Sequence, residues 1–571
     1  MKNNKISFFA TLLAVIVLSS CGGLNKMKDN AKNVSYSVTP SPLEVKGGKI
    51  EVAVTGKIPA KYFNKKAVLE VTPVLKYDGG ETALKPIKIQ GESVKENNKV
   101  IKYTEGGSYN YTDTLSFKKE MMVSTLEIRV KATLGKSNAD FAAVKVGDGV
   151  IATEYLVVMD PRAISLGDKF VRSTSDKIET DIKYSINQAD IRTSETKKAE
   201  LKKFNETLKA IDADPKKEIK GLELSSYASP DGPLDVNEKL AGKRKDASNK
   251  YFEKEFKKAK YSKVKDELFT YLVTAEDWDG FKALLEKSDV KDKELIIRVL
   301  SMYSDPIVRE KEIKNISAGY DELKVKILPQ LRRSKLAVNV TLVGKTDQEL
   351  VAMSQSNPDS LDVEEALFTA NLVADNNQKL AIYQAAAKKY PADVRPINNV
   401  GYVNIKLNKV ADAKTAFEAA QKITENEVVK NNLGVIALLE GDLKKAEDLF
   451  TASMSAGEVV SYNLGIIKII QGKYSDAINY FGNAAEVNAA LAKLLIKQND
   501  QALSTLNSVK SEDAVVSYLR AIVGARTQNT DMLFTNLKIA VGKSAALKAN
   551  AAKDLEFAKY FQDATFKSIV Q

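Results

Sequence analysis

The sequence predicts a multidomain protein with three folded parts: an N-terminal all-β sandwich, an α/β sandwich with a helical insertion, and a C-terminal all-α superhelix. Apolar and polar residues alternate within 35–160, strand and helix patterns alternate within 161–344, and a helical motif recurs within 345–571. At 571 residues, the chain has room for about three or four domains of roughly 150 residues each.

The composition excludes several classes of function. There is no histidine, which removes the commonest general base and the Ser-His and Cys-His nucleophile pairs. A single cysteine excludes intrachain disulfides and cysteine-rich metal clusters. No motif brings paired carboxylates or a Ser-Lys dyad together. We therefore expect a protein that is not an enzyme, with no catalytic residues, no cofactor and no metal site.

The formal net charge of +12 leaves two interpretations open. One is a lysine-rich solvated surface, and the other is attraction to anionic partners such as lipid headgroups, wall polymer or acidic proteins. The chain has no long basic run and no nucleic-acid motif, so no nucleic-acid partner is expected.

Residues 1–20 have the three parts of a secretory signal: a basic start, an apolar run that is short for a membrane span, and small residues at its end. Leu18-Ser19-Ser20-Cys21 resembles the bacterial lipobox, and Cys21 is the only cysteine. The resemblance implies that Cys21 is lipidated and becomes the N-terminus. Residues 21–34 are expected to be a polar tether. They lack the acidic cluster of many surface-exported lipoproteins of the Bacteroidota, which implies a protein anchored in the outer membrane and facing the periplasm.

Residues 35–160 are predicted to form an immunoglobulin-like β sandwich. Thr125–Leu134 alternates between apolar and polar residues, Lys49–Val54 and Ala67–Leu75 also have strand patterns, and glycine-rich turns separate these runs. Nothing in this part carries chemistry, so we expect a spacer or docking module.

Residues 161–344 are predicted to form an α/β sandwich. We expect a first strand and its following turn within Asp181–Arg192, with the break at Asn187-Gln188, then a helix from Ser194 to Ile211, a second strand at Leu222–Ser226 and a closing strand at Lys335–Val343. The stretch Tyr261–Leu328 has a helical pattern, which predicts a helical insertion at about 258–328.

The stretch Ser225–Ser248 has the spacing of a recognition loop and helix. Its residues Tyr227, Asn237, Leu240 and Arg244 resemble the motif of the OmpA C-terminal family, in which an aspartate and an arginine clamp the diaminopimelate of peptidoglycan. Ser229 stands at the place of the aspartate, and Asp231 follows two positions later. The resemblance implies a peptidoglycan site made of Ser229, Asp231, Asn237 and Arg244. The alternative is that the site is lost, with Asn237 and Arg244 used for loop capping and a salt bridge.

Residues 345–571 repeat. Gly401, Gly434 and Gly465 recur at spacings of 33 and 31 residues, and each is followed sixteen residues later by a phenylalanine, at 417, 450 and 481. This pattern resembles the tetratricopeptide (TPR) family, which implies a superhelix with a concave groove for a protein partner. Candidate groove residues are Asn398, Tyr402 and Asn431, for which surface and packing roles are the alternative.

Taken together, the chain resembles TPR/OmpA-like outer-membrane lipoproteins of the Bacteroidota. The resemblance implies a non-catalytic scaffold that holds protein partners at the periplasmic face of the outer membrane, as an accessory of secretion or assembly machinery. The alternative is a tether that links the outer membrane to peptidoglycan through the OmpA-like part.

Overall fold

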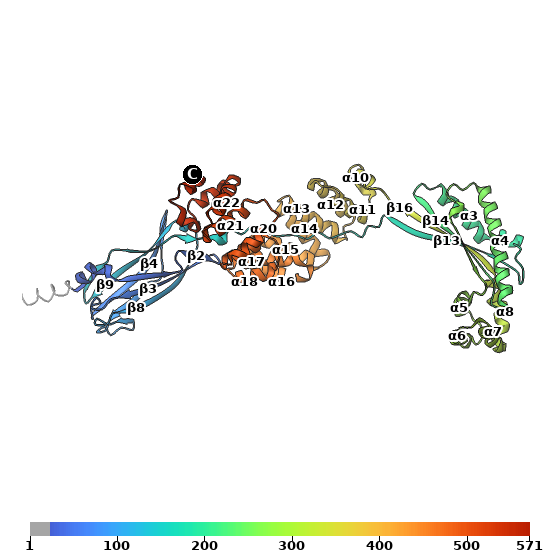
Figure 1. Cartoon of the computed structure of the whole chain (residues 1–571), viewed down its shortest axis with the longest axis horizontal. Helices are drawn as coiled ribbons and strands as arrows, with labels where there is room; N and C mark the ends of the chain where they lie inside the picture. Colours follow the sequence, from blue (N-terminus) through green and yellow to red (C-terminus); the bar gives the residue numbers. More distant parts are fainter. Residues whose placement is uncertain (1–22) are drawn as a thin grey trace, which may run out of the picture. The chain divides into compact units, whose positions relative to one another are not determined.

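The computed structural model describes residues 23–571, apart from the side chains of 317–319, so the signal peptide and Cys21 lie outside the described residues. The chain divides into two compact units (Figure 1). One unit combines the chain up to residue 167 with residues 375–571, and the other is residues 168–374. Residues 161–167 therefore group with the helical repeats, and residues 345–374 group with the α/β part, which differs from the expected boundaries. None of the helices in 23–571 has both the length and the apolar character that a membrane span requires.

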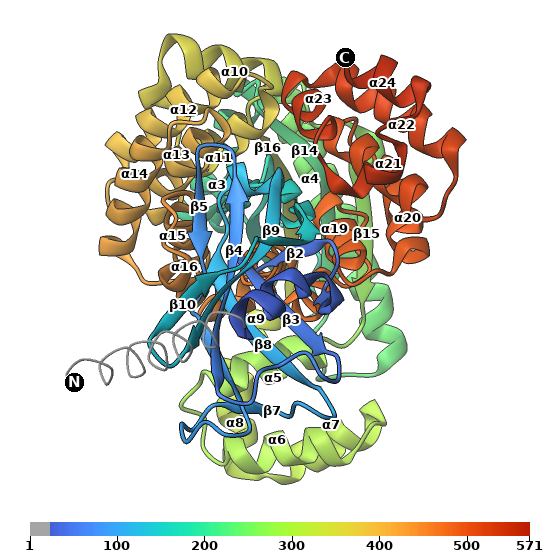
Figure 2. The same cartoon turned by 90° about the vertical axis from the view of Figure 1, so that its left-hand side faces the viewer.

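The N-terminal β module consists of two sheets that enclose one core. One sheet has the order β1-β3-β2-β12 with β8 also on β3, and the other has β10-β9-β4-β6-β7 with β11 on β9 and β5 on β4. Figure 2 shows the long strands β3, β4, β8 and β9 of this module. Their buried alternate residues, among them Ile50, Val52, Leu126 and Ile128, belong to a single hydrophobic cluster. The alternation predicted for Thr125–Leu134 is present in β9, where Leu126, Ile128, Val130 and Ala132 are buried.

The elements of this module are β1 (Ser35–Thr39), β2 (Leu43–Lys46), β3 (Lys49–Ile58), β4 (Ala67–Tyr77), β5 (Gly80–Ala83), β6 (Ile87–Gly91), β7 (Lys99–Ile101), β8 (Gly107–Ser116), β9 (Ser124–Leu134), β10 (Ser137–Asp140), β11 (Val144–Asp148), β12 (Val150–Ile151) and the short helices η1 (Ala31–Asn33), η2 (Lys119–Met122) and η3 (Thr153–Leu156). Residues 23–29 are helical, and Leu24 and Met27 are each 2% exposed in the module's core. This part of the expected tether is therefore folded onto the β module.

The α/β unit has a four-stranded sheet of order β13-β16-β14-β15, in which only the β14–β15 pair is parallel. Helices α3 and α4 bury Leu201, Phe204, Phe252 and Phe256 against sheet residues such as Leu336. The elements are β13 (Ser173–Lys183), α2 (Thr193–Thr196), α3 (Ala199–Ala213), β14 (Lys217–Tyr227), α4 (Leu234–Ala259), η4 (Asp266–Leu268), β15 (Phe269–Thr274), α5 (Trp278–Glu286), α6 (Lys293–Met302), α7 (Pro306–Asn315), α8 (Ser317–Lys326), α9 (Leu328–Leu331), β16 (Arg333–Val343), α10 (Asp347–Ser356), η5 (Pro358–Ser360) and α11 (Val363–Leu372).

Two predicted elements of this unit were wrong. Strand β13 runs from Ser173 to Lys183, so the strand predicted from Asp181 to the break at Asn187-Gln188 overlaps only its last residues, and the rest falls in the following loop. The stretch predicted to be continuously helical contains the strand β15, Phe269–Thr274. This run of aromatic, aliphatic and threonine residues has high β propensity, and it pairs in parallel with β14. The helical insertion is therefore α5 to α9, which follows β15.

Residues 376–571 form a series of antiparallel helix pairs, coloured from gold to red in Figure 1. The pairs are α13/α14, α15/α16, α17/α18, α19/α20 and α21/α22. The bounds are α12 (Asn376–Lys389), α13 (Val394–Lys406), α14 (Val410–Ile423), α15 (Glu427–Leu439), α16 (Leu443–Thr451), η6 (Met454–Ala456), α17 (Glu458–Ile470), α18 (Tyr474–Phe481), α19 (Val487–Leu495), α20 (Asn499–Ser508), α21 (Ala514–Arg526), α22 (Thr530–Lys543), α23 (Ala545–Ala551), η7 (Leu555–Tyr560) and α24 (Ala564–Val570).

The recurring glycine and phenylalanine meet inside each pair. A Cβ atom added at Gly434 on α15 would lie 2.6 Å from Cε1 of Phe450 on α16, and the same relation holds for Gly401 with Phe417. In the structure, the aromatic ring packs on the glycine of its own pair, where only a residue without a side chain leaves room for it.

Candidate functional site

The concave side of the helical repeats holds a segment of the same chain. Residues 157–167, which we call the strap, connect the β module to the α/β unit in sequence, and they lie along the first helices of the repeats. The strap's Val157, Ala163 and Ile164 pack on the hydrophobic clusters of the repeats. The groove that the sequence assigned to a separate partner is therefore filled by the protein itself.

Four asparagine side chains bind the strap backbone in the same way. Each amide oxygen accepts a backbone N–H, and each amide nitrogen donates to the carbonyl of that same strap residue. Asn488 binds Val158 in this way, Asn463 binds Arg162, Asn432 binds Ile164 and Asn399 binds Leu166, with distances of 2.7 to 2.9 Å. The residues bound are all even-numbered, as expected for an extended segment whose alternate residues face the same side.

Two further asparagines complete this amide ladder. Asn431 donates to the Arg162 carbonyl, and Asn398 donates to the Ile164 carbonyl, both at 3.1 Å. The side chains also bond to one another, for example Asn432 to Asn398 at 2.8 Å and Asn463 to Asn431 at 3.0 Å. The six asparagines are at most 1% exposed. Buried amides need both donor and acceptor partners, and an extended backbone supplies both. The ladder is therefore a site for an extended peptide backbone.

Side-chain contacts select this particular strap sequence. The Arg162 guanidinium donates twice to the Glu486 carboxylate, each at 2.8 Å, and lies 3.6 Å from the centre of the Tyr462 ring. The Tyr462 hydroxyl donates to Asp160 at 2.5 Å. Because backbone contacts carry no sequence information, this group of charged and aromatic side chains supplies the specificity.

The β module is also fixed directly to the repeats. The Glu154 carboxylate accepts the backbone N–H groups of Gly47 and Gly48 at 2.7 and 2.9 Å, and the Tyr474 hydroxyl on α18 donates to the same carboxylate. The β2–β3 turn is so close to the α17–α18 turn that a Cβ atom at Gly47 would lie 2.8 Å from the carbonyl oxygen of Gln471. The strap and this contact join the β module and the repeats into one unit.

The predicted groove residues have different outcomes. Asn398 and Asn431 are fully buried and bind the carbonyls of the chain's own strap. The expectation that they meet a separate partner segment is therefore replaced by binding within the chain. Tyr402 is half-buried, with Lys406 Nζ 5.6 Å from the centre of its ring. The sequence analysis did not name the other four asparagines of the ladder as groove residues: Asn399, Asn432, Asn463 and Asn488. The recurring Asn-Asn and Tyr-Asn pairs were the signal for the positions of the first three.

In the α/β unit, Arg244 is used by the protein's own backbone. Its guanidinium donates to the carbonyls of Gln188 (3.0 Å), Tyr227 (2.9 Å) and Ser185 (3.3 Å), and it is 1% exposed. Burial, with a smaller contribution from nearby Arg332, lowers the pKa of Arg244 to about 10. Arg244 thus links the loop that follows β13 to the end of β14.

The carboxylate of Asp231 is paired within the chain as well. Arg332 donates to Asp231 at 3.1 Å and to the Ser229 hydroxyl at 3.2 Å, and Ser229 itself bonds to Asp231. The Asn237 side chain donates to the Gly232 carbonyl at 3.1 Å, which closes the loop before α4. The structure brings all four predicted residues to one loop, where each has a partner in the chain. Arg332, which the sequence reasoning did not include, supplies the charge that Asp231 needs.

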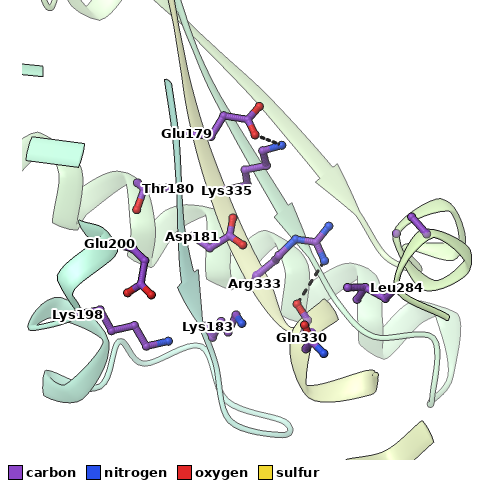
Figure 3. Close-up of a pocket in the computed structure, with 12 residues that line it drawn as sticks. Glu179, Thr180, Asp181, Lys183, Lys198, Glu200, Leu284, Gln330, Arg333 and Lys335 are labelled. Atoms are coloured by element: carbon purple, nitrogen blue, oxygen red, sulfur yellow. Dashed lines mark hydrogen bonds and ion pairs between the residues drawn. The ribbon is translucent and has the colours of Figure 1, made fainter. Parts of the chain in front are cut away.

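A charged cleft of about 500 Å³ lies elsewhere on this unit, beside β13, β16 and α5 (Figure 3). Glu179 and Lys335 form an ion pair across it at 2.6 Å, and Arg333 donates to Asp277 at 2.8 Å. Asp181 points toward Arg333 in Figure 3, and burial raises the pKa of its carboxyl. Residues of both charges line the cleft, and no motif in the sequence points to it.

A second cleft, of about 530 Å³, lies between α12 and α14, and its lining combines apolar residues such as Leu380 and Ile397 with the charged Lys409 and Asp412. Asn404 lies in the same lining and is 3% exposed, and its amide oxygen has no hydrogen-bond partner among the described residues. Asn404 comes five residues after Asn399. The residue five positions after Asn432, its equivalent in the next repeat, is Ala437. Asn404 thus leaves a hydrogen-bond acceptor unused in this cleft.

Within residues 23–571, no cluster of three or more cysteine, aspartate or glutamate side chains is placed to hold a metal ion.

No model of a protein family matches the sequence, and no curated protein matches it. Solved structures of TPR proteins do show similarity. The APC/C hetero-tetramer Cut9–Hcn1 is 15% identical, over 39% of this chain and 45% of that chain, with a TM-score of 0.32. A TPR protein from Parabacteroides merdae is 12% identical, over 39% and 89% of the two chains, with a TM-score of 0.28. YrrB, described as a TPR protein with an unusual peptide-binding site, is 17% identical, over 31% and 97%, with a TM-score of 0.24.

The chain thus spans less than half the length of Cut9–Hcn1. TM-scores of this size support no further comparison of function. Residues 376–571 form an all-α repeat region that resembles TPR proteins in its recurring helix pairs and their glycine–phenylalanine contacts.

Proposed function

We propose that this protein is a non-catalytic scaffold, anchored by a lipidated Cys21 in the outer membrane and facing the periplasm, that holds a protein partner for secretion or assembly machinery. The observation that carries the proposal is the strap in the TPR groove, which converts the repeats and the β module into one stiff body. A body whose groove is already filled is suited to support a partner on its outer surface. The TPR fold supports protein–protein interaction as the general role.

The partner surface that we favour is the cleft between α12 and α14, because it combines apolar and charged side chains with the unused acceptor of Asn404. A photo-crosslinking amino acid at Gln384, an exposed residue of that cleft, tests this in cells. Thr451 is the matched control, since it is exposed and directly follows the buried Phe450 on α16, as Gln384 follows the buried Tyr383 on α12.

We expect a discrete crosslinked species from Gln384 that is absent from Thr451, with the partner identified by mass spectrometry. The scaffold proposal fails if no discrete species forms from Gln384. Membrane fractionation with Cys21→Ser tests the anchor separately: the variant should leave the outer-membrane fraction.

The alternative, a peptidoglycan tether through an OmpA-like loop, is disfavoured by the Arg332–Asp231 pair, because a ligand ammonium would have to displace Arg332. Retention of the full chain on purified peptidoglycan, competed by free diaminopimelate, would establish the tether in place of the scaffold. We expect no such retention.

A further inference from the structure

Strand β15 of the α/β unit is an edge strand: among the described residues it has a neighbouring strand on one side only. It pairs only with β14, and its consecutive residues Tyr271, Leu272 and Val273 are 46%, 53% and 42% exposed. Phe269–Thr274 contains no charged residue, no proline and no glycine. Soluble proteins usually protect such an edge with charge, proline, a bulge or a covering element, because its free backbone groups pair with other strands. The strand therefore has the properties of a pairing surface.

Helix α4 runs along one face of this edge. The Tyr271 hydroxyl donates to Asn249 of α4 at 2.9 Å, and the ring centres of Phe269 and Phe256 are 6.4 Å apart. Going from Phe269 to Tyr271 along the strand therefore corresponds to going from Phe256 back to Asn249 along the helix. Helix α4 thus runs antiparallel to β15. Asn249 marks the point of α4 that is level with Tyr271.

Opposite charges flank that point at equal distances along the helix. Lys245, four residues before Asn249, has its Nζ 5.8 Å from the centre of the Tyr271 ring. Glu253, four residues after Asn249, accepts a hydrogen bond from the Asn249 side chain at 2.7 Å. Along the stripe of α4 that contacts Tyr271, spaced four residues apart, a positive Lys245 therefore precedes Asn249 and a negative Glu253 follows it, beside an uncharged strand.

We propose that β15 is the interface with a second copy of this chain, in which the two β15 strands pair antiparallel about a two-fold axis near Tyr271. A two-fold axis reverses the direction of α4 while keeping it on the same face. Lys245 then faces the partner's Glu253, and Glu253 faces the partner's Lys245. In the strand, Leu272 lies opposite the partner's Thr270, and Val273 opposite the partner's Phe269. Aromatic–β-branched cross-strand pairs of this kind stabilise sheets.

The second copy fits better than an unrelated strand because the charge pattern is complementary to itself. A strand from another protein needs its own acidic and basic groups at matching positions, whereas the two-fold arrangement supplies them from Lys245 and Glu253. The pairing also removes the free edge from each copy, and the strand itself places no like charges opposite one another.

Sedimentation velocity of the full mature chain with Cys21→Ser, over a concentration series, tests the proposal. We expect a reversible dimer. Lys245→Glu should weaken it at least tenfold, since it places two carboxylates opposite each other, and Glu253→Lys should do the same. The double variant Lys245→Glu/Glu253→Lys should restore the dissociation constant to within about threefold of the wild-type value, because the charges again alternate across the axis.

The strand is tested by Leu272→Lys, with Val325→Lys as the matched control at a 77%-exposed apolar residue on α8. Leu272→Lys should abolish the dimer, and Val325→Lys should leave it unchanged. Circular dichroism checks that each variant is folded. A chain that stays monomeric at all concentrations overturns the proposal, as does a dimer insensitive to Leu272→Lys or one that the double charge exchange fails to restore.

Discussion

The side-chain amide of Asn432 pairs with the backbone of Ile164 in both directions: it accepts the Ile164 N–H at 2.7 Å and donates to the Ile164 carbonyl at 2.8 Å. These two residues are 268 positions apart in the chain. The pair lies within the amide ladder. The side-chain amide of Asn432 bonds to both backbone groups of Ile164, as the backbone of a neighbouring strand would. It is the point where loss of one side chain should release the strap.

Asn432→Ala should weaken the strap at its middle. It leaves the buried Ile164 N–H without its partner and removes one of the two donors to the Ile164 carbonyl, the other being Asn398. An unsatisfied buried group costs about 1–3 kcal/mol, so the free energy of unfolding should fall by about that amount. Hydrogen exchange measured by mass spectrometry should show faster exchange at the Ile164 and Leu166 amides.

Asn479→Ala is the control, since Asn479 is an exposed residue of α18. It should leave both the exchange rates and the stability close to those of the wild type. If the strap amides exchange as slowly in Asn432→Ala as in the wild type, the ladder does not hold the strap.

Gly434→Ala should destabilise the repeats. The added Cβ atom would lie 2.6 Å from Cε1 of Phe450, so the ring or the helix pair must move. Overpacking of a core costs about 1–3 kcal/mol, and thermal unfolding followed by circular dichroism should show a lower midpoint. Combining the change with Phe450→Leu should recover part of the loss.

The control for this prediction is Gly542→Ala in α22, where an added Cβ atom meets nothing within 4 Å. Alanine is favoured over glycine in a helix by up to about 1 kcal/mol, so this variant should be as stable as the wild type or more so. Equal effects at the two glycines would mean that helix propensity, and not contact with the aromatic ring, determines the result.

Stability should depend on Asp554 between about pH 4 and pH 6. Burial raises the pKa of this carboxyl to about 6, and it accepts a hydrogen bond from the Tyr518 hydroxyl at 2.9 Å. The folded state therefore holds the Asp554 proton to a higher pH than the unfolded state does. The free energy of unfolding falls as pH rises through this range, by a contribution on the order of 3 kcal/mol.

Asp554→Asn removes this titration while keeping an acceptor for Tyr518. The free energy of unfolding of the variant should rise relative to that of the wild type as pH rises from 4 to 6. Above pH 6 the difference between the two should stay constant. Urea unfolding at several pH values measures the difference. A constant difference across pH 4 to 7 would show that Asp554 does not titrate as proposed.

Arg244→Lys should destabilise the α/β unit although the charge is kept. A lysine cannot donate to the Gln188, Tyr227 and Ser185 carbonyls in the fork geometry of a guanidinium. Losing part of a buried network of this kind costs about 2–4 kcal/mol. Trp278 is the only tryptophan and lies in this unit, so its fluorescence reports the unfolding transition directly.

The neighbouring Lys243→Ala provides the comparison, because Lys243 is exposed on the same helix. It should shift the midpoint of the transition only slightly. Arg244→Lys with wild-type stability would mean that the three carbonyl contacts contribute little.

The sequence predicted the repeats well because their packing depends on local residue types at fixed spacing. Gly434 and Phe450 are sixteen residues apart, and the contact between them is visible as a recurring pattern. The alternation in β9 was equally readable, since one face of that strand is buried. Strand β13 was misplaced because its sequence is mostly polar and buries only a few residues, among them Ile182.

The strap could not be predicted, because the contacts that hold it use its backbone. Only the side chains of its binding site carry a signal, and that signal, the repeated asparagine pair, is also typical of a groove for a foreign peptide. The Arg332–Asp231 pair was missed for a related reason. The two residues are about a hundred positions apart, and the fold alone brings them together.

The strap also dictates the order in which the protein can be completed. Val158 and its receptor Asn488 are separated by 330 positions, so the β module leaves the ribosome long before the repeats that bind its strap exist. Meanwhile the α/β unit, whose first and last strands β13 and β16 pair from Ser173 with Val343 to Lys183 with Arg333, contains all the partners of its own sheet. We expect that unit, like the sheets of the β module, to fold before the strap docks on the repeats. The other unit, which combines the chain up to residue 167 with residues 375–571, is completed last, because its C-terminal helices are synthesised last.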